Sequence, residues 1–100
     1  MDADKIREIG WTLVKQEEEG GGDLVSRYTM SAGDGRGNTI FTYHLKLKLR
    51  KGYTYWMCQI YRKLTIVQDD CTNETKMVLF NGRIADEEEL KTITKIAIRG

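Results

Sequence analysis

The feature that most constrains this chain is a strict two-residue alternation over residues 43–50. Apolar side chains occupy the odd positions and basic ones the even positions, in the order Tyr-His-Leu-Lys-Leu-Lys-Leu-Arg. Side chains on a β-strand alternate between the two faces of the sheet, so this segment predicts a strand with one apolar and one basic face. Residues 53–60 continue the alternation after Lys51-Gly52, which predicts an antiparallel hairpin with a tight turn.

The pairing across this hairpin follows from the predicted turn. We expect Leu49, Leu47, Leu45 and Tyr43 to lie opposite Thr54, Trp56, Cys58 and Ile60, in that order. A one-residue slip would turn every apolar side chain outward, so the pattern strongly determines which face is buried. The basic face is the candidate binding surface, because cations and aromatic rings alternate on it. Its candidate residues are His44, Lys46, Lys48, Arg50, Tyr53, Tyr55, Met57 and Tyr61.

Helix signals stand at both ends of the chain. Asp2 is the expected cap of a short helix that reaches Ile9 and ends at Gly10. Asp86 is the expected cap of a C-terminal helix, with Glu89 at the capping-box position. The stripe predicted to face the sheet consists of Leu90, Ile93, Ile96 and Ala97.

Strands are predicted between the two helices. The expected ranges are 11–16, with Trp11 and Leu13 on one face, then 24–31, 39–50, 53–67 and 76–84. The fourth is long and is expected to bend or bulge near Arg62-Lys63, and the fifth to kink at Asn81-Gly82. Residues 17–23 and 68–74 are predicted turns. The fold class is therefore α+β: an antiparallel meander of four to five strands with both helices and one packed face.

The length and charge of the chain limit the class of protein. One hundred residues correspond to a single small domain over residues 1–100. A net charge of +1, with 31% charged residues, is typical neither of a disordered polyelectrolyte nor of a high-pI nucleic-acid binder. Residues 35–68 contain no acid, whereas acids gather in residues 17–23, 69–74 and 86–89. A fold that keeps these groups apart would be strongly dipolar.

No residue pattern indicates catalysis or metal binding. The glycine-rich residues 33–37 precede a strand rather than a helix, which favours a hairpin connection over an anion contact through Arg36. His44 has no expected acid–base partner, and one histidine with two separated cysteines does not supply a zinc site. Cys58 is expected in the core, and Cys71 lies beside Asp69 and Asp70, which disfavour its thiolate. We therefore expect no enzymatic activity, no cofactor and no metal.

Two binding functions remain open for the basic face. The first is a non-enzymatic interaction module for a protein partner, of the kind found among accessory or inhibitor proteins of mobile elements. The alternative is single-stranded nucleic-acid binding, with bases stacked on the tyrosines. The same pattern is also compatible with an ordinary solvent-facing sheet, with docking at the acidic turns, or with a homo-oligomer formed through a sheet edge.

The expected compartment follows from the cysteines and the hydropathy. The first residues contain no apolar stretch typical of a secretory signal, and the two cysteines do not indicate a disulfide framework. No apolar run approaches the roughly 20 residues that a membrane span needs. We therefore expect a cytoplasmic protein that does not associate with a membrane.

Overall fold

The structure is a computed structural model, described here for residues 1–31 and 39–98. It contains one five-stranded sheet in which neighbours in the sequence are neighbours in space, and every pairing is antiparallel. The elements, in chain order, are α1 (Ala3–Ile9), β1 (Thr12–Glu19), β2 (Asp23–Ser31), β3 (Thr39–Leu49), β4 (Trp56–Gln68), β5 (Cys71–Ile84) and α2 (Glu87–Ala97). The predicted α+β meander with two terminal helices is confirmed.

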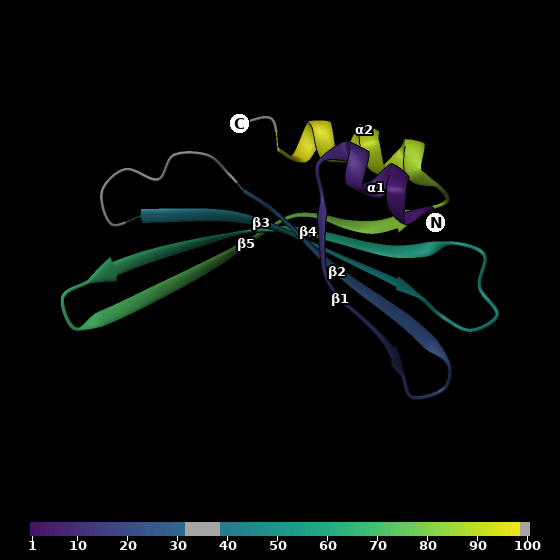
Figure 1. Cartoon of the computed structure of the whole chain (residues 1–100), viewed down its shortest axis with the longest axis horizontal. Coiled ribbons are helices and arrows are strands. Elements are labelled where there is room, and N and C mark those ends of the chain that lie inside the picture. The colour runs from purple at the N-terminus through teal and green to yellow at the C-terminus, as the bar shows by residue number, and fades with distance from the viewer. Residues whose placement is uncertain (32–38, 99–100) are drawn as a thin grey trace.

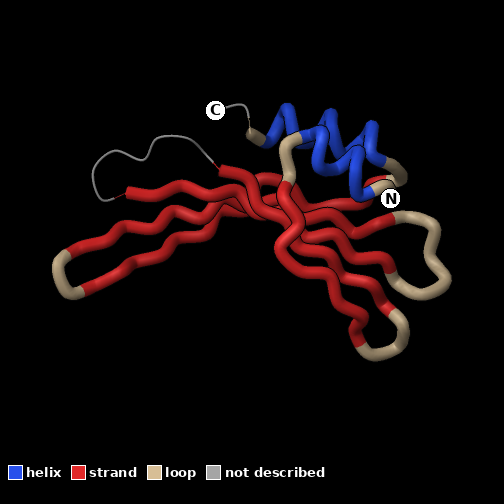
Figure 2. The backbone as a smooth tube through the Cα atoms, viewed as in Figure 1, coloured by secondary structure: helices blue, strands red, loops and turns tan. Residues whose placement is uncertain are grey.

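Both helices lie on the same face of the sheet and cover only part of it (Figure 1). We call this the helix face and the opposite side the open face. The first part of β3, the last part of β4 and the first part of β5 extend well past the helices (Figure 2). We call this extension, in which residues 39–42, 63–68 and 71–76 pair with one another, the arm.

The core lies between the helices and the middle of the sheet. Leu45, Leu47 and Ile60 contribute from the central strands, and Ile6 and Leu90 contribute from the helices, each at most 1% exposed. Trp11 is equally buried, and its Nε1 donates a hydrogen bond to Thr94 Oγ1 at 3.1 Å. Trp11 precedes β1. Leu13 lies in line with Tyr28 and Leu45 on the helix face, but on this edge strand it is 47% exposed and does not join the core.

The helix caps form as the sequence predicts. Asp2 accepts a hydrogen bond from the amide of Asp4, and Asp86 accepts one from the amide of Glu89 at 3.0 Å. The stripe on α2 differs from the prediction, because Ile96 is 69% exposed while Thr94 is buried. Positions four and seven after Leu90 return to its side of a helix with 3.6 residues per turn, whereas position six does not.

The β3–β4 hairpin has a longer loop than predicted. Leu47 pairs with Cys58 and Leu45 with Ile60, so the register differs by two residues from the expected one. A two-residue type I′ turn needs positive φ at both positions, and here only Gly52 has it, at +87°. Residues 50–55 form the loop instead. A shift of two residues preserves the alternation, so the predicted faces of the paired residues are correct although their partners are not.

The β1–β2 and β4–β5 turns are shorter than predicted. β1 continues through Glu19, which leaves Gly20–Gly22 as the turn, and Gly21 and Gly22 have φ near +87°. β5 begins at Cys71, directly after a two-residue turn at Asp69-Asp70. Residues 17–19 and 71–74 are therefore strand rather than loop. The glycine-rich segment with Arg36 lies outside the described residues.

The irregularity in the last two strands lies near Arg62-Lys63, as predicted, but the additional residue belongs to β5. The register shifts between Ile60 and Tyr61, leaving Leu79 as the additional residue of β5. The predicted kink at Asn81-Gly82 is not found, because the pairing with β4 is regular there. A Cβ on Gly82 would lie 2.9 Å from Phe80 Cζ, so this glycine makes room for a packed ring within a strand that reaches Ile84, as predicted.

Candidate binding surface

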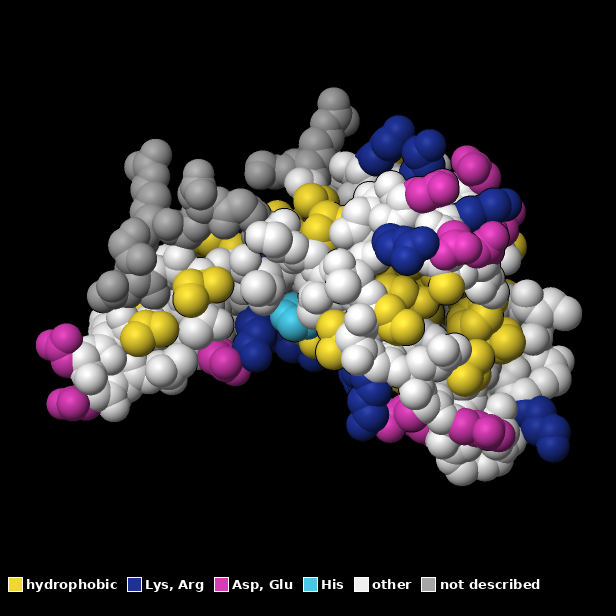
Figure 3. Space-filling view, viewed as in Figure 1, with side chains coloured by type: hydrophobic (Ala, Val, Ile, Leu, Met, Phe, Trp, Pro, Cys, Tyr) yellow, Lys and Arg dark blue, Asp and Glu magenta, His cyan; other side chains and the backbone are white. Residues whose placement is uncertain are grey.

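The open face combines side chains from all five strands. One cross-strand row contains Lys15, Arg27 and Lys46 as direct neighbours, followed by Gln59 and Asn81. Like charges in direct opposition destabilise a sheet, so this row is a cost to folding unless something binds it. Lys and Arg side chains gather beside the histidine along the lower edge of the space-filling view, with acids among them (Figure 3).

A hollow in the open face brings several predicted residues together. It has a volume of about 260 Å³ and is lined by Lys46, Lys48, Arg50, Met57, Cys58, Gln59 and Asn81. Four of these belong to the candidate set from the sequence. Met57 is 38% exposed and gives the hollow an apolar contact group among its cations.

Tyr53 and Tyr55 lie away from the strand face on which they were predicted. Both belong to the β3–β4 loop, where their rings meet edge to face with centroids 5.3 Å apart. Tyr55 still reaches the open face, because the guanidinium of Arg83 lies 5.1 Å from its ring centroid. Tyr53, 46% exposed, faces Arg50 at 5.6 Å.

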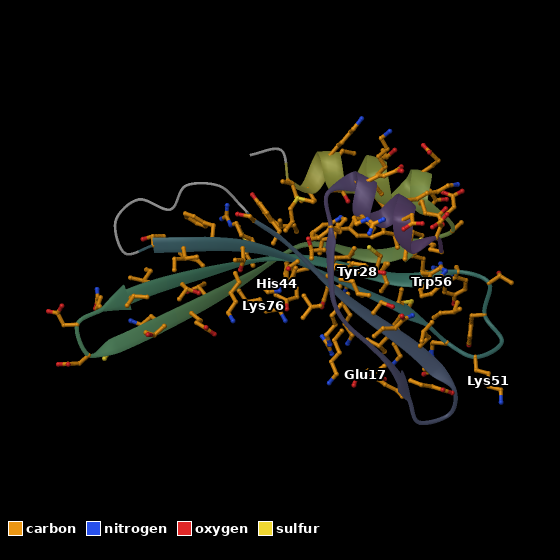
Figure 4. The ribbon with its side chains drawn as sticks, in the orientation of Figure 1. Glu17, Tyr28, His44, Lys51, Trp56 and Lys76 are labelled. Carbon is orange, nitrogen blue, oxygen red and sulfur yellow. The ribbon has the colours of Figure 1, made fainter. Side chains whose placement is uncertain are left out.

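The ring of Tyr61 is occupied by its own neighbours. His44 stacks on it with centroids 4.8 Å apart and an interplanar angle of 7°, and the ammonium of Lys76 lies 4.0 Å from its centroid. His44 and Lys76 both project from the open face (Figure 4). A base could stack on Tyr61 only by displacing one of these groups.

The acids do not stay apart from the cations, contrary to the dipolar arrangement considered from the sequence. Lys48 Nζ lies 3.2 Å from Glu19 Oε2 and 3.8 Å from Asp23 Oδ2. Lys15 pairs with Glu17 and Lys63 with Glu74, at 3.2 and 3.1 Å. Within the described residues, the ion pairs of this face leave five cations without a carboxylate: Arg27, Lys46, Arg50, Lys76 and Arg83.

His44 is not placed for proton transfer. Its Nε2 lies 3.0 Å from Thr42 Oγ1, and a hydroxyl does not orient or charge an imidazole as a carboxylate does. Burial lowers the pKa of His44, and the nearby Lys63 and Lys76 lower it further. The ring is therefore neutral at neutral pH and serves as a stacking partner of Tyr61.

The cysteines differ in exposure, and they form no metal site among the described residues. Burial raises the pKa of the Cys58 thiol to about 12, which keeps it protonated. Cys71 is exposed at the tip of the arm. In residues 1–31 and 39–98, no three His, Cys, Asp or Glu side chains cluster as metal ligands would. Neither described helix has the length and apolar character to cross a membrane.

Sequence reasoning missed several cations of the surface. Arg27 lies opposite Lys46, and the alternation of Arg27 with Ser26 and Tyr28 was a signal that could have placed it there. Lys76 and Arg83 gave no such signal, because the additional residue at Leu79 interrupts the alternation between them.

Comparison with known proteins gives no relative for this arrangement. No protein-family model, no curated protein and no solved structure matches the chain. Functional reasoning therefore rests on the geometry of the open face.

Proposed function

We propose that this protein is a non-enzymatic interaction module that binds an acidic surface of a protein partner through its open face. The observation that carries the proposal is the hollow of about 260 Å³, in which Lys46 and Arg50 present charges without a carboxylate beside Met57. Uncompensated cations attract carboxylates, and arginine and methionine are enriched in protein contact surfaces. An accessory or inhibitor protein would need only such a surface.

The occupied aromatic rings favour protein over nucleic acid. Single-stranded nucleic acids bind by stacking bases on free ring faces, whereas Tyr61 is covered by His44 and Lys76. Glu17, Glu19 and Glu74 pair with Lys15, Lys48 and Lys63 on this face and so interrupt the continuous track of cations that a phosphate backbone would follow. A protein side chain can instead enter between acids and cations and pair with whichever group complements it.

One observation supports the alternative function. The row formed by Lys15, Arg27 and Lys46 crosses three strands in a line, as a contact for a phosphate backbone would. Single-stranded nucleic-acid binding is therefore the second candidate, and it is tested in the same experiment.

The test compares two probes on one pair of variants. Labelled poly-glutamate and a poly-dT oligonucleotide of matched length are titrated with the protein at low ionic strength, and fluorescence anisotropy is measured. Lys46→Glu with Arg50→Glu reverses two charges of the hollow and spares the ion pairs of Lys48. Lys91→Glu with Lys95→Glu makes the same change of net charge on exposed positions of α2.

We expect the wild type and the α2 control to bind poly-glutamate and the hollow variant to bind it at least about tenfold more weakly. Thermal midpoints should stay close to that of the wild type, because exposed charges contribute little to folding. Binding of poly-dT without poly-glutamate would establish the alternative function. Equal binding by both variants, or no binding of either probe, would contradict the proposal.

A further inference from the structure

The two edges of the sheet differ in how well they are protected against pairing. The outer edge of β1 carries Glu17, Glu18 and Glu19 in succession and has a bulge after Leu13. Like charges and bulges are common devices that prevent edge-to-edge association. The outer edge of β5 has no bulge and no run of like charges over residues 71–78; its two charges, Glu74 and Lys76, are opposite in sign, every residue is exposed and the pairing with β4 is regular.

The β4–β5 turn determines which backbone groups of this edge are free. Gln68 pairs with Cys71 across a two-residue turn, so the two form a hydrogen-bonded pair. Because such pairs alternate along an antiparallel ladder, the odd residues of β5 from Cys71 to Met77 point their N–H and C=O groups at β4. Thr72, Glu74, Lys76 and Val78 therefore point theirs outward. Within the described residues, no strand lies beyond β5 to accept them.

We propose that this edge pairs antiparallel with the same edge of a second copy of this chain, with the twofold axis at Thr75. In this register Glu74 lies opposite Lys76 of the partner, and Lys76 opposite the partner's Glu74. Thr72 then lies opposite the partner's Val78. Each of these pairs joins residues whose free N–H and C=O groups face each other, so the backbone hydrogen bonds of the new ladder can form in full.

Charge selects this register over its neighbours. In the nearest registers that still pair outward N–H and C=O groups with each other, the twofold axis lies at Glu74 or at Lys76. The first places the two copies of Glu74 opposite each other and the second the two copies of Lys76, and like charges in direct opposition destabilise a sheet. The axis at Thr75 instead gives two opposite-charge pairs in one dimer.

This pairing would also reduce a repulsion between like charges within the protomer. Lys63 and Lys76 are direct cross-strand neighbours of like charge, and Lys63 is paired with Glu74 at 3.1 Å. The partner's Glu74 would lie on the other side of Lys76 and neutralise it. The exposed side chains of Met77 and Val78, at 44% and 51%, would lose contact with water in the same step.

The expected dimer is weak and reversible. A strand pair of this length buries far less than the roughly 1,600 Å² of a standard interface, so we expect a Kd on the order of 10⁻⁵ M. The pairing does not involve the hollow around Lys46. The dimer and the proposed function can therefore fail independently.

The first experiment exchanges charges and measures mass by sedimentation velocity over a range of concentrations. Glu74→Lys alone and Lys76→Glu alone each place like charges opposite each other at two points, and each should weaken the dimer about tenfold or more. An equal mixture of the two variants restores both opposite-charge pairs and should dimerise like the wild type. Lys46→Glu with Arg50→Glu should leave the dimer unchanged.

The second experiment tests the register in a Cys71→Ser background. Thr75 would form a non-hydrogen-bonded pair with its own copy, whose Cα atoms lie about 4.5 Å apart, a separation that a disulfide spans. Thr75→Cys should therefore cross-link under mild oxidation. Thr72→Cys should not, since the two copies of residue 72 would be about 20 Å apart. Three results would overturn the proposal. The wild type could remain a monomer at a concentration of about 10⁻³ M, the equal mixture of Glu74→Lys and Lys76→Glu could fail to dimerise, or Thr72→Cys could cross-link as readily as Thr75→Cys.

Discussion

The part of the sheet that lies under the helices, which we call the covered region, shares its strands with the arm. The two regions are stabilised differently. On β4, Ile60 is fully buried beneath the helices, whereas Val67 in the arm is 43% exposed. On β3, Leu45 is 1% and Ile40 is 53% exposed. Strand pairing thus continues well past the core. The comparison teaches that hydrogen-bonded strand pairs can extend a sheet with side chains that are only half-buried or exposed, once the helices supply a core at one end.

The cysteines give the largest expected contrast between the two regions. Cys71 at the tip of the arm is exposed, whereas Cys58 is 1% exposed and the pKa of its thiol is raised to about 12 by burial. Reaction of Cys58 with a thiol reagent requires opening of the core, which we expect to cost about 5 kcal/mol or more. Cys58 should therefore react at least about a thousandfold more slowly than Cys71, since each 1.4 kcal/mol is roughly a factor of ten. Timed labelling with mass spectrometry measures both rates, and similar rates would mean that the covered region opens as readily as the arm.

Matched truncations of isoleucine test the same contrast in stability. Ile60→Ala removes a side chain with 0% exposure and should lower the free energy of unfolding by about 2–5 kcal/mol. Ile40→Ala in the arm should lower it by less than about 1 kcal/mol, because its side chain is 53% exposed. Urea denaturation followed by tryptophan fluorescence gives both values. Equal losses would show that the arm contributes to the core as much as the covered region does.

The buried hydrogen bond from Trp11 to Thr94 belongs to the covered region. Thr94→Val removes the acceptor and leaves the indole N–H buried without a partner, which should cost about 1–3 kcal/mol. Thr92→Val is the control on the same helix, since Thr92 is exposed and its hydroxyl only donates to the carbonyl of Glu88. We expect the control to change the thermal midpoint little. If Thr94→Val left the stability unchanged, this hydrogen bond would not help to hold the helices on the sheet.

The smallest effect belongs to His44, near the boundary between the two regions. Burial, Lys63 and Lys76 lower its pKa in the folded protein below the ordinary 6.5, so the unfolded chain binds the proton first as the pH falls. Stability should therefore decrease as the pH drops through about 6.5 toward the folded-state pKa, and be unaffected by His44 above that range. Denaturation curves from pH 8 to pH 5 for the wild type and His44→Gln measure the difference. A variant with an identical pH dependence would contradict the lowered pKa.

The alternation in the sequence predicts the faces of the central strands because burial acts on every second residue. Leu45, Leu47, Cys58 and Ile60 are buried as predicted, with Lys46 and Lys48 on the other side. The partners could not be predicted in the same way, because a shift of two residues satisfies the same pattern. The loop at residues 50–55 determines that shift, and its length depends on backbone angles at Lys51 and Gly52.

The candidate surface was less predictable than the fold. Four of its predicted residues line the hollow, but the charge of Lys48 is compensated by acids from β1 and β2, which no local pattern indicates. The rings of Tyr53 and Tyr55 lie in a loop whose course depends on the same register. Ion pairs and stacking partners across a sheet follow from which strands become neighbours, and a single-strand periodicity does not contain that information.

The contact between the two helices has a consequence for how the chain reaches its fold. Each strand pairs with the next strand in the sequence, so the sheet can form hairpin by hairpin through short loops. The amide of Asp2 and the carboxylate of Glu87, and likewise Trp11 and Thr94, meet across separations of 85 and 83 residues. Among the side-chain hydrogen bonds of the described residues, these two join the positions farthest apart in the sequence. We therefore expect α1 to dock on α2 late, after the meander has already brought the two ends of the chain together and so reduced the entropy lost in closing the loop between them.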